Sequence, residues 1–334
     1  MRATNWIGDA VMSLPAIRAV RDIFPHAQVI VLAKPWVADV YARESAIDGV
    51  IPYAGTRREI AARLRAQRFD AALLLQNAFD AALVAWMAGI PVRIGYNRDA
   101  RGLLLTHAIP VPEPGEIPRH ERFYYLELLR RAGLMERFPF CDAIRLDGVD
   151  AARADGAAHL ARLGIEGPVI GVSPGAAFGS AKRWPAERFA QVAREFPRAL
   201  LFGSNAEREL CDRIAADVPG AVNLAGQTSL REFIDLASVC RLFLTNDSGA
   251  MHIASAVGVP TVTVFGATDD TTTGPTGPLA RVVREHAECS PCLLRECPID
   301  HRCMTRVTPE RVTAVARELL EPYRPPRNGG VLAC

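Results

Sequence analysis

The feature of this sequence that most restricts its fold is the alternation of short apolar runs with longer amphipathic stretches. Six runs rich in Val, Ile, Leu and Ala lie at residues 29–32, 71–75, 169–172, 199–202, 242–245 and 261–265. They are almost continuously apolar, as strands are when helices cover both faces of their sheet, and Pro or Gly ends most of them. The pattern predicts an α/β protein with doubly wound parallel sheets.

The length of the chain predicts two domains. With 334 residues, 49% of them hydrophobic, the chain can bury two cores. A connector with three prolines spans residues 111–118, and a helix at 150–164 precedes the strand at 169–172. That strand opens a second Rossmann-like unit, so we expect domains at residues 1–150 and 151–334.

Charge and cysteine usage exclude several classes of protein. A net charge of +2 does not favour nucleic-acid binding, and no apolar run reaches the roughly 20 residues that cross a bilayer. The start of the chain has no signal-peptide pattern, so we expect a cytoplasmic protein. Four of the eight cysteines are scattered, which favours reduced thiols. Arginine supplies every basic residue except Lys34 and Lys182.

The first motif is NWIGDAVMSLPAI, in which Gly8 and Asp9 precede an apolar periodic stretch. An aspartate at a helix start can simply cap free N–H groups, which is worth about 1 kcal/mol. It can also present a carboxylate at the edge of a cleft. The residues alone leave both interpretations open.

The second motif is SPGAAFGSAKRWP, a loop of small residues that follows a strand. Gly175 and Gly179 form neither a Walker motif nor a G-x-G-x-x-G fingerprint, so a plain strand-to-helix turn remains an alternative. Lys182 favours a phosphate site, because a phosphate suits a point charge on a flexible stem and this chain otherwise uses arginine. We therefore predict that the loop binds phosphate.

The third motif is NDSGAMHIASAVGVP, in which a buried strand ends and a helix starts at once. Ser248 and Gly249 offer a hydroxyl and free N–H groups where the helix dipole favours anions. Asp247 suits this place if it orients the loop or accepts a hydrogen bond from a sugar hydroxyl. His252, one turn later, is within reach of the same pocket, although a structural role is the commoner fate of a lone histidine.

The fourth motif, CSPCLLRECPIDHRC, contains Cys289, Cys292, Cys297 and Cys303, with His301 nearby. The first pair has metal-ligand spacing, but five residues separate the second pair, unlike the compact pairs of zinc knuckles. We expect no bound metal. A metal-dependent interaction protein is the alternative.

Together, these four motifs resemble the ADP-heptose:lipopolysaccharide heptosyltransferases of glycosyltransferase family 9, the type II group in particular. The resemblance covers nearly the whole chain in the right order. It implies the GT-B fold, in which two Rossmann-like domains face each other across a cleft. It also implies that the C-terminal domain binds ADP-heptose and that the N-terminal domain binds the lipopolysaccharide core acceptor, heptosyl-Kdo-lipid A.

The resemblance further implies an inverting transfer with Asp9 as the general base and Lys182 as a catalytic residue. No D-x-D motif for a divalent ion occurs in the sequence, so a metal-independent reaction without a cofactor is expected. Stabilisation of the leaving group would then fall to the lysine and to a helix N-terminus. The residues that the resemblance assigns to substrate binding are Ser204, Glu207, Thr228, Asp247, Ser248, Gly249, Ala250 and His252.

Two further expectations follow from the resemblance. Family members begin with an apolar strand before the motif of Asp9, whereas only four residues precede Asn5 here. We therefore expect the first strand to be largely absent and the true start to lie upstream of Met1. A lipid-linked acceptor implies peripheral contact with the inner membrane. Five arginines could make this contact, or they could merely form a solvated helix face: Arg57, Arg58, Arg63, Arg65 and Arg68.

The alternatives that remain open differ in class. One is another family 9 transferase with a different acceptor. The other is a non-catalytic module that binds a nucleotide. Turnover with ADP-heptose would separate the two.

Overall fold

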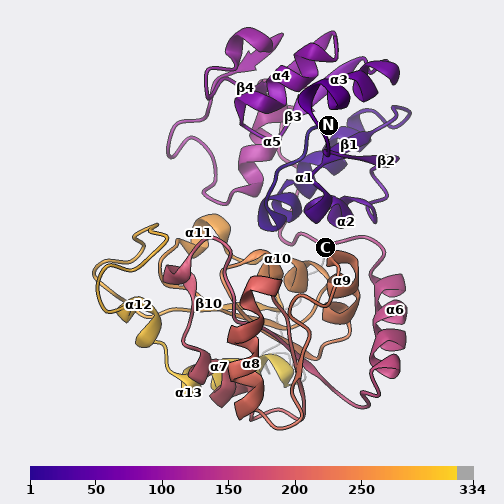
Figure 1. The fold of residues 1–334 in the computed structure, drawn as a ribbon. Helices are drawn as coiled ribbons and strands as arrows, with labels where there is room; N and C mark the ends of the chain where they lie inside the picture. Colours follow the sequence, from indigo (N-terminus) through magenta and orange to yellow (C-terminus); the bar gives the residue numbers. More distant parts are fainter. Residues whose placement is uncertain (322–334) are drawn as a thin grey trace, which may run out of the picture.

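Parallel sheets organise both halves of the computed structural model, which describes residues 1–321 (Figure 1). All strand pairs are parallel, so the predicted α/β fold is confirmed. In the N-terminal half, β1 pairs with β2, and β4 lies between β3 and β5. The bounds are β1 (Ile30–Ala33), β2 (Gly49–Pro52), β3 (Ala71–Leu74), β4 (Val92–Tyr96) and β5 (His107–Ile109).

The first residues of the chain join the two groups of N-terminal strands. The structure has no regular strand before β1, but Arg2 forms parallel bridges to both Leu32 of β1 and Leu74 of β3. The Arg2 N–H donates to the Leu73 carbonyl at 2.8 Å, and the Ala3 N–H donates to the Leu32 carbonyl at 3.0 Å. Residues 1–3 thus occupy the central position, and their carboxyl end leads directly into α1.

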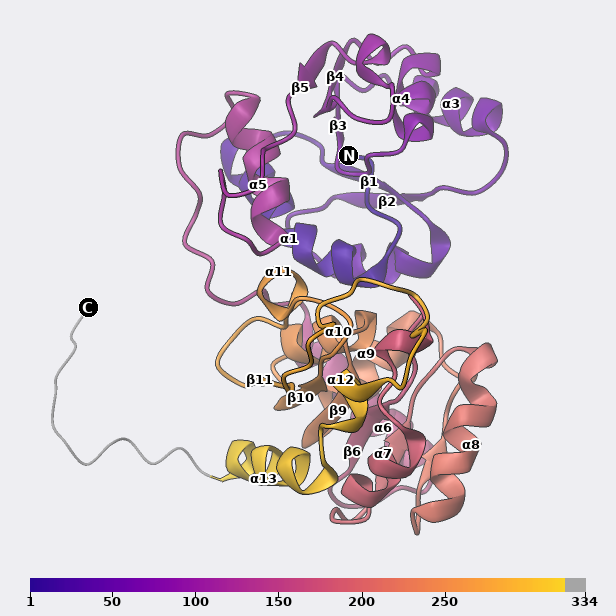
Figure 2. The same cartoon turned by 90° about the vertical axis from the view of Figure 1, so that its left-hand side faces the viewer.

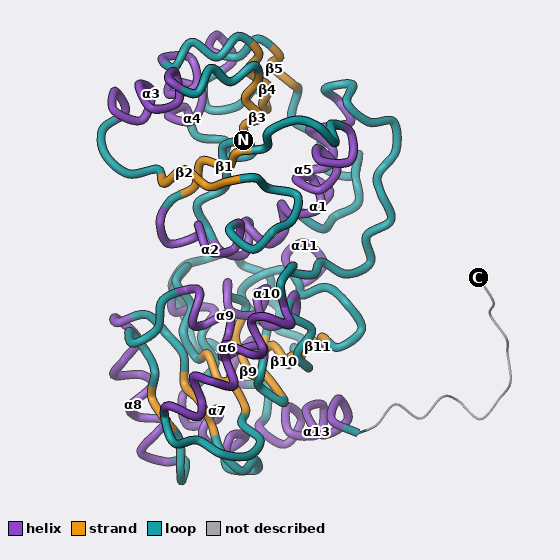
Figure 3. The backbone as a smooth tube through the Cα atoms, turned by 90° about the vertical axis from the view of Figure 1, so that its right-hand side faces the viewer, coloured by secondary structure: helices purple, strands orange, loops and turns teal. Residues whose placement is uncertain are grey.

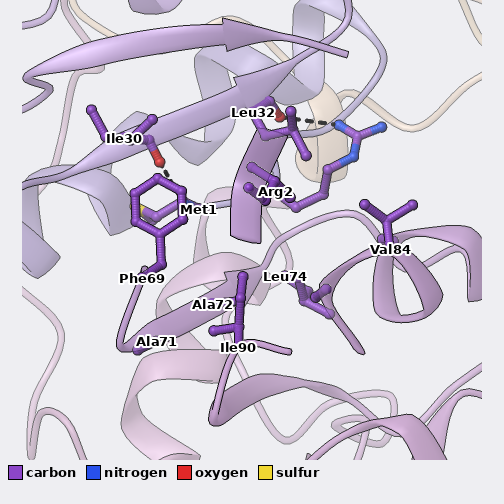
Figure 4. A pocket seen from close by; sticks show the side chains of 13 residues that line it. Met1, Arg2, Ile30, Leu32, Phe69, Ala71, Ala72, Leu74, Val84 and Ile90 are labelled. Atoms are coloured by element: carbon purple, nitrogen blue, oxygen red, sulfur yellow. Dashed lines mark hydrogen bonds between the residues drawn. The ribbon is translucent and has the colours of Figure 1, made fainter. Parts of the chain in front are cut away.

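A small apolar cavity lies beside Met1, between β1 and β3 (Figure 4). Its volume is about 40 Å³, and Ile30, Phe69 and Ile90 are among the residues that line it. The amino group of Met1 donates to the Ile30 carbonyl. Burial lowers the pKa of this amine to about 5, because a charged group is poorly solvated there.

The C-terminal half contains one six-stranded sheet in the order β11-β10-β9-β6-β7-β8. The central strands β6 and β9 are buried at every position, as expected of strands covered on both faces. The loops at the carboxyl ends of β6 and β9 therefore lie side by side. The bounds are β6 (Ile170–Ser173), β7 (Ala199–Leu201), β8 (Val222–Asn223), β9 (Leu242–Asn246), β10 (Thr261–Val264) and β11 (Ala280–Val283).

Helices connect the strands in both halves. No helix within residues 1–321 is both long and apolar enough to cross a membrane. The first half has α1 (Ile7–Ile23), η1 (Pro35–Val37), α2 (Ala38–Tyr41), α3 (Arg57–Ala66), α4 (Phe79–Met87), η2 (Gly102–Leu104) and α5 (Arg122–Arg131). The second has α6 (Val149–Arg162), η3 (Ser180–Lys182), α7 (Ala186–Ala193), η4 (Asn205–Glu207), α8 (Arg208–Asp217), α9 (Leu230–Ser238), α10 (Gly249–Ala256), α11 (Asp270–Thr273), α12 (Arg302–Thr305) and α13 (Pro309–Leu320).

The two halves meet where α1 and α2 lie over α10 and α9 (Figures 1 and 2). Ion pairs hold both flanks of this contact: Arg43 pairs with Asp235, and Arg119 pairs with Asp269 at 2.6 Å. The tube view shows the loops at the upper edge of the lower half facing the upper half (Figure 3). Residues that follow strands in both halves therefore lie close together in the region between the two halves.

Candidate active site

A cavity of about 380 Å³ lies between the two halves of the chain. Residues just after the central N-terminal segment and at the start of α1 form one wall. The loops after β6 and β9, with the first turns of α10, form the other wall. Ligands of doubly wound folds bind at such carboxyl edges. The lining residues are Asn5, Trp6, Ile7, Gly8, Asp9, Met12, Trp36, Ala177, Phe178, Lys182, Asp247, Ser248, Gly249, His252 and Thr273.

Two glycines allow the N-termini of α1 and α10 to touch at the floor of this cavity. A Cβ atom on Gly249 would lie 2.8 Å from the Cβ of Ile7. A Cβ atom on Gly8 would lie 2.8 Å from the ring of His252. Side chains at either position would push the helices apart, so the glycines set the width of the cleft at this point.

Gly8→Ala should therefore reduce both stability and activity. The added methyl group would force the buried ring of His252 or the helix to shift, which costs about 1–3 kcal/mol. Asp9 follows directly and would be displaced, so kcat/KM should fall. Thermal unfolding and steady-state kinetics measure the two effects. Asp22→Ala, on the exposed end of the same helix, is the matched control, and a Gly8 variant indistinguishable from it would contradict the contact.

Asp9 lines the cavity from the first turn of α1. Trp6 is the N-cap residue and no side chain caps this helix, so the structure does not use Asp9 as the cap. Burial raises the pKa of Asp9 to about 6, and the positive charge of Lys182 limits the rise. A carboxylate with this pKa is ionised near neutral pH and is more basic than an exposed aspartate. It therefore has the properties of a general base.

Lys182 reaches the cavity from the opposite wall, within η3. Its ammonium donates to the Oδ2 atom of Asp247 at 2.5 Å, and the hydroxyl of Thr268 donates to the same oxygen at 2.6 Å. The ammonium also lies 4.8 Å from the centre of the Phe178 ring. Asp247 thus orients the lysine, a contact that differs from the two roles expected for this carboxylate, which were to orient the loop or to accept from a sugar hydroxyl.

The loop that carries Lys182 is fixed by Asn246, the last residue of β9. The Asn246 side-chain amide donates to the Pro174 carbonyl at 2.7 Å, and its oxygen accepts from the Trp184 N–H at 3.0 Å. These bonds clamp both ends of the loop to the neighbouring strand. The sequence places Asn246 beside the predicted phosphate site but does not reveal that it joins two motifs.

The N-terminus of α10 presents free donors to the cavity. Ser248 is the N-cap residue, and its side chain makes no capping hydrogen bond. Its hydroxyl lies 3.2 Å from the Thr245 hydroxyl. The first amides of the helix, including those of Gly249 and Ala250, have no partner within the helix, as in any helix first turn. The arrangement suits a bound anion.

His252 lies on the cavity floor and is only 6% exposed. Burial lowers its pKa to about 4, so the ring is neutral at physiological pH. A neutral imidazole in contact with Gly8 contributes shape and hydrogen-bonding nitrogens to the cavity rather than positive charge. On the wall that the C-terminal half forms, positive potential therefore comes from Lys182 and from the N-terminus of α10. We call it the cationic wall.

The lining of this cavity does not include four of the predicted substrate-binding residues. Ala250 follows Gly249 in the first turn of α10, and the other three lie farther along the sheet. Ser204 and Glu207 form a capping box at η4, and Thr228 precedes the N-cap of α9. All three follow β7 or β8, which lie beside β6 in the same sheet. They stand along the same carboxyl edge, farther from Asp9. The carboxylate of Glu207 also packs against Gly175 of the predicted phosphate loop, residues 173–185.

Several residues of the site have no clear signal in the sequence. Trp6 and Trp36 line the cavity although both are more than half exposed. Glu121 precedes α5, and its N–H donates to the Thr272 carbonyl at 2.9 Å. Burial and the negative charge of Asp9 raise the pKa of Glu121 to about 7. A second carboxyl group thus lies close enough to be affected by the charge of Asp9, at the N-cap of α5 and 112 positions later in the chain, although it does not line the cavity.

The cysteine segment, residues 289–303, packs against the predicted phosphate loop. The Arg295 carbonyl accepts from the Ala181 N–H at 3.0 Å, and the His301 Nε2 atom lies 2.8 Å from the Ala181 carbonyl. Among the described residues, no group of three or more His, Cys, Asp or Glu side chains is placed to hold a metal ion. Residues 1–321 include seven of the cysteines, all as free thiols, and Cys334 lies outside this range.

Comparison with known proteins identifies a family. A profile of glycosyltransferase family 9 (heptosyltransferase) matches residues 57–302. Lipopolysaccharide heptosyltransferase 2 of Escherichia coli K12 is 32% identical over 300 residues, which is 84% of this chain and 86% of the relative. Lipooligosaccharide heptosyltransferase 2 of Campylobacter jejuni strain 81116 is 28% identical over 95% of this chain and 98% of its own length.

A solved structure supports the same relationship. The structure of E. coli ADP-heptose lps heptosyltransferase II superposes with a TM-score of 0.81 at 30% identity. The match covers 96% of this chain and 97% of that one. The similarity therefore extends over both halves and the cavity between them.

Proposed function

Because this chain belongs to glycosyltransferase family 9, the heptosyltransferases, we propose that it transfers heptose from ADP-L-glycero-β-D-manno-heptose to the inner-core heptose of lipopolysaccharide. The observation that carries the proposal is the interdomain cavity. Asp9 stands on one wall, and Lys182 with the N-terminus of α10 stands on the other. Relatives named heptosyltransferase 2 match nearly the whole chain.

The proposed reaction inverts the anomeric carbon. The acceptor hydroxyl oxygen attacks that carbon, the bond to the β-phosphate oxygen of ADP breaks, and its electron pair leaves with ADP. Asp9 accepts the proton of the attacking hydroxyl. No enzyme-bound sugar forms in this scheme. The positions of Asp9 and Lys182 on opposite walls support it, because nucleophile and leaving group must lie on opposite faces of the sugar.

The leaving diphosphate is stabilised by donors that the protein already holds in place. The Lys182 ammonium supplies a full positive charge, and the Ser248 hydroxyl with the amides of Gly249 and Ala250 supplies dipoles. Asp247 and Thr268 orient the ammonium before substrate binds. We propose that this set replaces a divalent ion and that the reaction is independent of metal.

The adenosine part of the donor extends along the same sheet edge in this proposal. Ser204 and Glu207 follow β7, and Thr228 follows β8. From the diphosphate at the carboxyl end of β9, the nucleoside would cross the loop after β6 to reach them. Their hydroxyl and carboxylate oxygens suit the ribose and the adenine amino group.

We also propose that the enzyme works at the inner membrane surface, where its lipid-linked acceptor resides. Three of the arginines expected to form a basic face have local roles. Arg57 pairs with Asp80, while Arg63 and Arg65 donate to backbone carbonyls. Their exposed positions on and beside α3 still leave positive charge at the surface. Co-sedimentation with anionic vesicles tests this contact.

The pH dependence of transfer should report the basicity of Asp9. A base acts only when ionised, and burial raises the pKa of Asp9 to about 6. We expect kcat/KM to be constant above about pH 7 and to fall about tenfold per unit below pH 6. Initial rates between pH 5 and 8 measure the profile. A profile that stays flat down to pH 5 would exclude Asp9 as the base with the expected pKa.

Turnover with defined acceptors tests the function itself. Purified protein is incubated with ADP-heptose and truncated cores that end at Kdo, at the first heptose or at the second heptose. Release of ADP with the acceptor that ends at the first heptose is expected. Preference for another core would indicate a different family 9 acceptor. Binding of ADP without turnover of any core would indicate a non-catalytic module.

A further inference from the structure

The second lysine of the chain lies close to the same cavity as the first. The sequence contains 39 basic residues of the Lys and Arg types, and only Lys34 and Lys182 are lysines. Lys34 directly follows β1, at the carboxyl edge of the N-terminal sheet. Its ammonium lies 5.6 Å from the centre of the Trp36 ring, which lines the cavity on the wall of Asp9. Lys34 thus lies next to the cavity wall that the N-terminal half forms, opposite the wall that carries Lys182.

The surroundings of Lys34 carry more positive than negative charge. The Lys34 ammonium and the Arg2 guanidinium each lie 4.4 Å from the centre of the Tyr53 ring. The Tyr53 hydroxyl donates to Asp80, which also pairs with Arg57. Three cations, those of Lys34, Arg2 and Arg57, thus lie around Tyr53 and Asp80, and the one carboxylate among them is already paired with Arg57.

Lys34 itself has no carboxylate partner within 4.0 Å among residues 1–321, unlike Lys182. The Arg2 guanidinium is directed elsewhere, since it donates to the Asn5 side chain at 2.8 Å and to backbone carbonyls. Lys34 is partly buried, and its ammonium lies near the aromatic rings of Trp36 and Tyr53. A cation that has no carboxylate partner and lies beside a residue lining the cavity is complementary to an anion.

An exposed indole ring, that of Trp36, adjoins this cation, and a second one, that of Trp6, lines the same cavity. Trp36 is 57% exposed and Trp6 is 53% exposed, yet both line the cavity. The Trp36 Nε1–H donates to the Asn5 carbonyl at 2.9 Å, which fixes the orientation of the ring. Rigid aromatic faces with a polar neighbour are typical of sites that bind amphipathic ligands such as sugars.

We infer that Lys34 binds an anionic substituent, a phosphate or a carboxylate, on the acceptor saccharide, whose sugar ring lies against Trp36. This inference rests on the proposed function and extends it by naming the chemistry that the acceptor must carry. The subsite lies on the same wall as Asp9, so a bound anion would hold the attacking hydroxyl toward the base. Lysine suits the task because its flexible stem lets a point charge follow the anion.

Acceptor kinetics with parent, Lys34→Ala and Lys34→Arg proteins test the inference. Three acceptors are compared: the intact core, a core treated with phosphatase and a core with its carboxylates reduced. With the intact core, Lys34→Ala should raise the KM for acceptor by about 10- to 100-fold, the usual range for a hydrogen bond to a charged group. The KM for ADP-heptose should change less than about twofold, and Lys34→Arg should recover part of the loss. Arg213→Ala, on the exposed face of α8, is the matched control for loss of one charge.

The modified acceptors decide which anion is bound. If Lys34 binds a phosphate, the phosphatase-treated core should raise the KM of the parent, and Lys34→Ala should cause no further rise. The carboxyl-reduced core should show the same pattern if the anion is a carboxylate. Equal losses for Lys34→Ala on all three acceptors, or a loss that falls on ADP-heptose, would overturn the inference while leaving the proposed function intact. Failure of the parent to turn over any acceptor would overturn both.

Discussion

Asp9→Asn should reduce kcat by a factor of about 10²–10⁴, the range supplied by a general base. The amide keeps the size and shape of the carboxylate but cannot accept the proton of the attacking hydroxyl. Asp9 does not belong to the cationic wall, so the Kd for ADP should stay within about threefold of the parent value or improve slightly, since a negative charge has been removed. Single-turnover kinetics and calorimetric titration with ADP measure the two quantities.

The same substitution should stabilise the protein at neutral pH. Because burial raises the pKa of Asp9 to about 6, its ionised form costs the folded state free energy above that pH. At pH 7–8, Asp9→Asn should raise the free energy of unfolding by about 1–2 kcal/mol. The gain should shrink as pH falls from 6 towards 4 and disappear below about pH 3, where the aspartate is protonated in both the folded and the unfolded state. Urea unfolding at several pH values measures it.

Asp22→Asn is the matched control for both effects. It makes the same chemical change on the same helix, at an exposed position. It should leave transfer and stability unchanged. An Asp9→Asn enzyme with the turnover of this control would contradict the assignment of the base.

Lys182→Ala should weaken donor binding and transfer together. Within residues 1–321, Lys182 is the only Lys or Arg that lines the cavity, so the variant loses the positive charge proposed to hold the diphosphate. We expect the Kd for ADP to rise about 10- to 100-fold and kcat to fall about 100-fold, because charge on the leaving group grows in the transition state. Titration with ADP and steady-state kinetics with ADP-heptose measure these effects.

The stability of the Lys182 variant has to be separated from its function. Asp247 is 6% exposed, and without the lysine its charge keeps only the Thr268 hydroxyl as a partner. Loss of one member of a buried pair costs about 3–5 kcal/mol. The double variant Lys182→Ala, Asp247→Asn should recover much of that loss but not the affinity for ADP. Recovery of ADP affinity in the double variant would contradict a direct role for the lysine.

Local sequence patterns predict much of the fold and of the donor side of the site. The buried strands β6, β9 and β10 overlap the runs predicted at residues 169–172, 242–245 and 261–265, and the motif after β9 combines a strand end with a helix start. Lys182 stands out against a background of arginine. Each of these signals lies within one short segment, so no knowledge of tertiary contacts is needed to recognise it.

Contacts between distant segments explain what sequence patterns miss. Lys182 and Asp247, which pair in the structure, are 65 positions apart in the sequence. The Oδ2 atom of Asp247 also accepts a hydrogen bond from the Thr268 hydroxyl. Glu121 approaches Asp9 only because α5 packs against α1. The sequence allows Asp9 to cap its helix, whereas the structure has Trp6 as the N-cap residue.

Short or edge strands are also beyond local prediction. β2, β4 and β5 contain proline, arginine or histidine, and their apolar runs are brief. Residues 1–3 are too few for a periodic signal, yet backbone bonds to β1 and β3 hold them at the centre of the sheet. Their pairing depends on neighbours that are themselves 30 and more residues away.

A crystal structure of the protein with ADP tests the central claim most directly. We predict diphosphate oxygens about 3 Å from the Lys182 ammonium and from the first amides of α10. Asp9 should face the diphosphate across the cavity without touching it, which leaves room for the sugar between them. A diphosphate bound away from Lys182 and Ser248, or held against the Asp9 wall, would contradict the proposed division between base and leaving-group site.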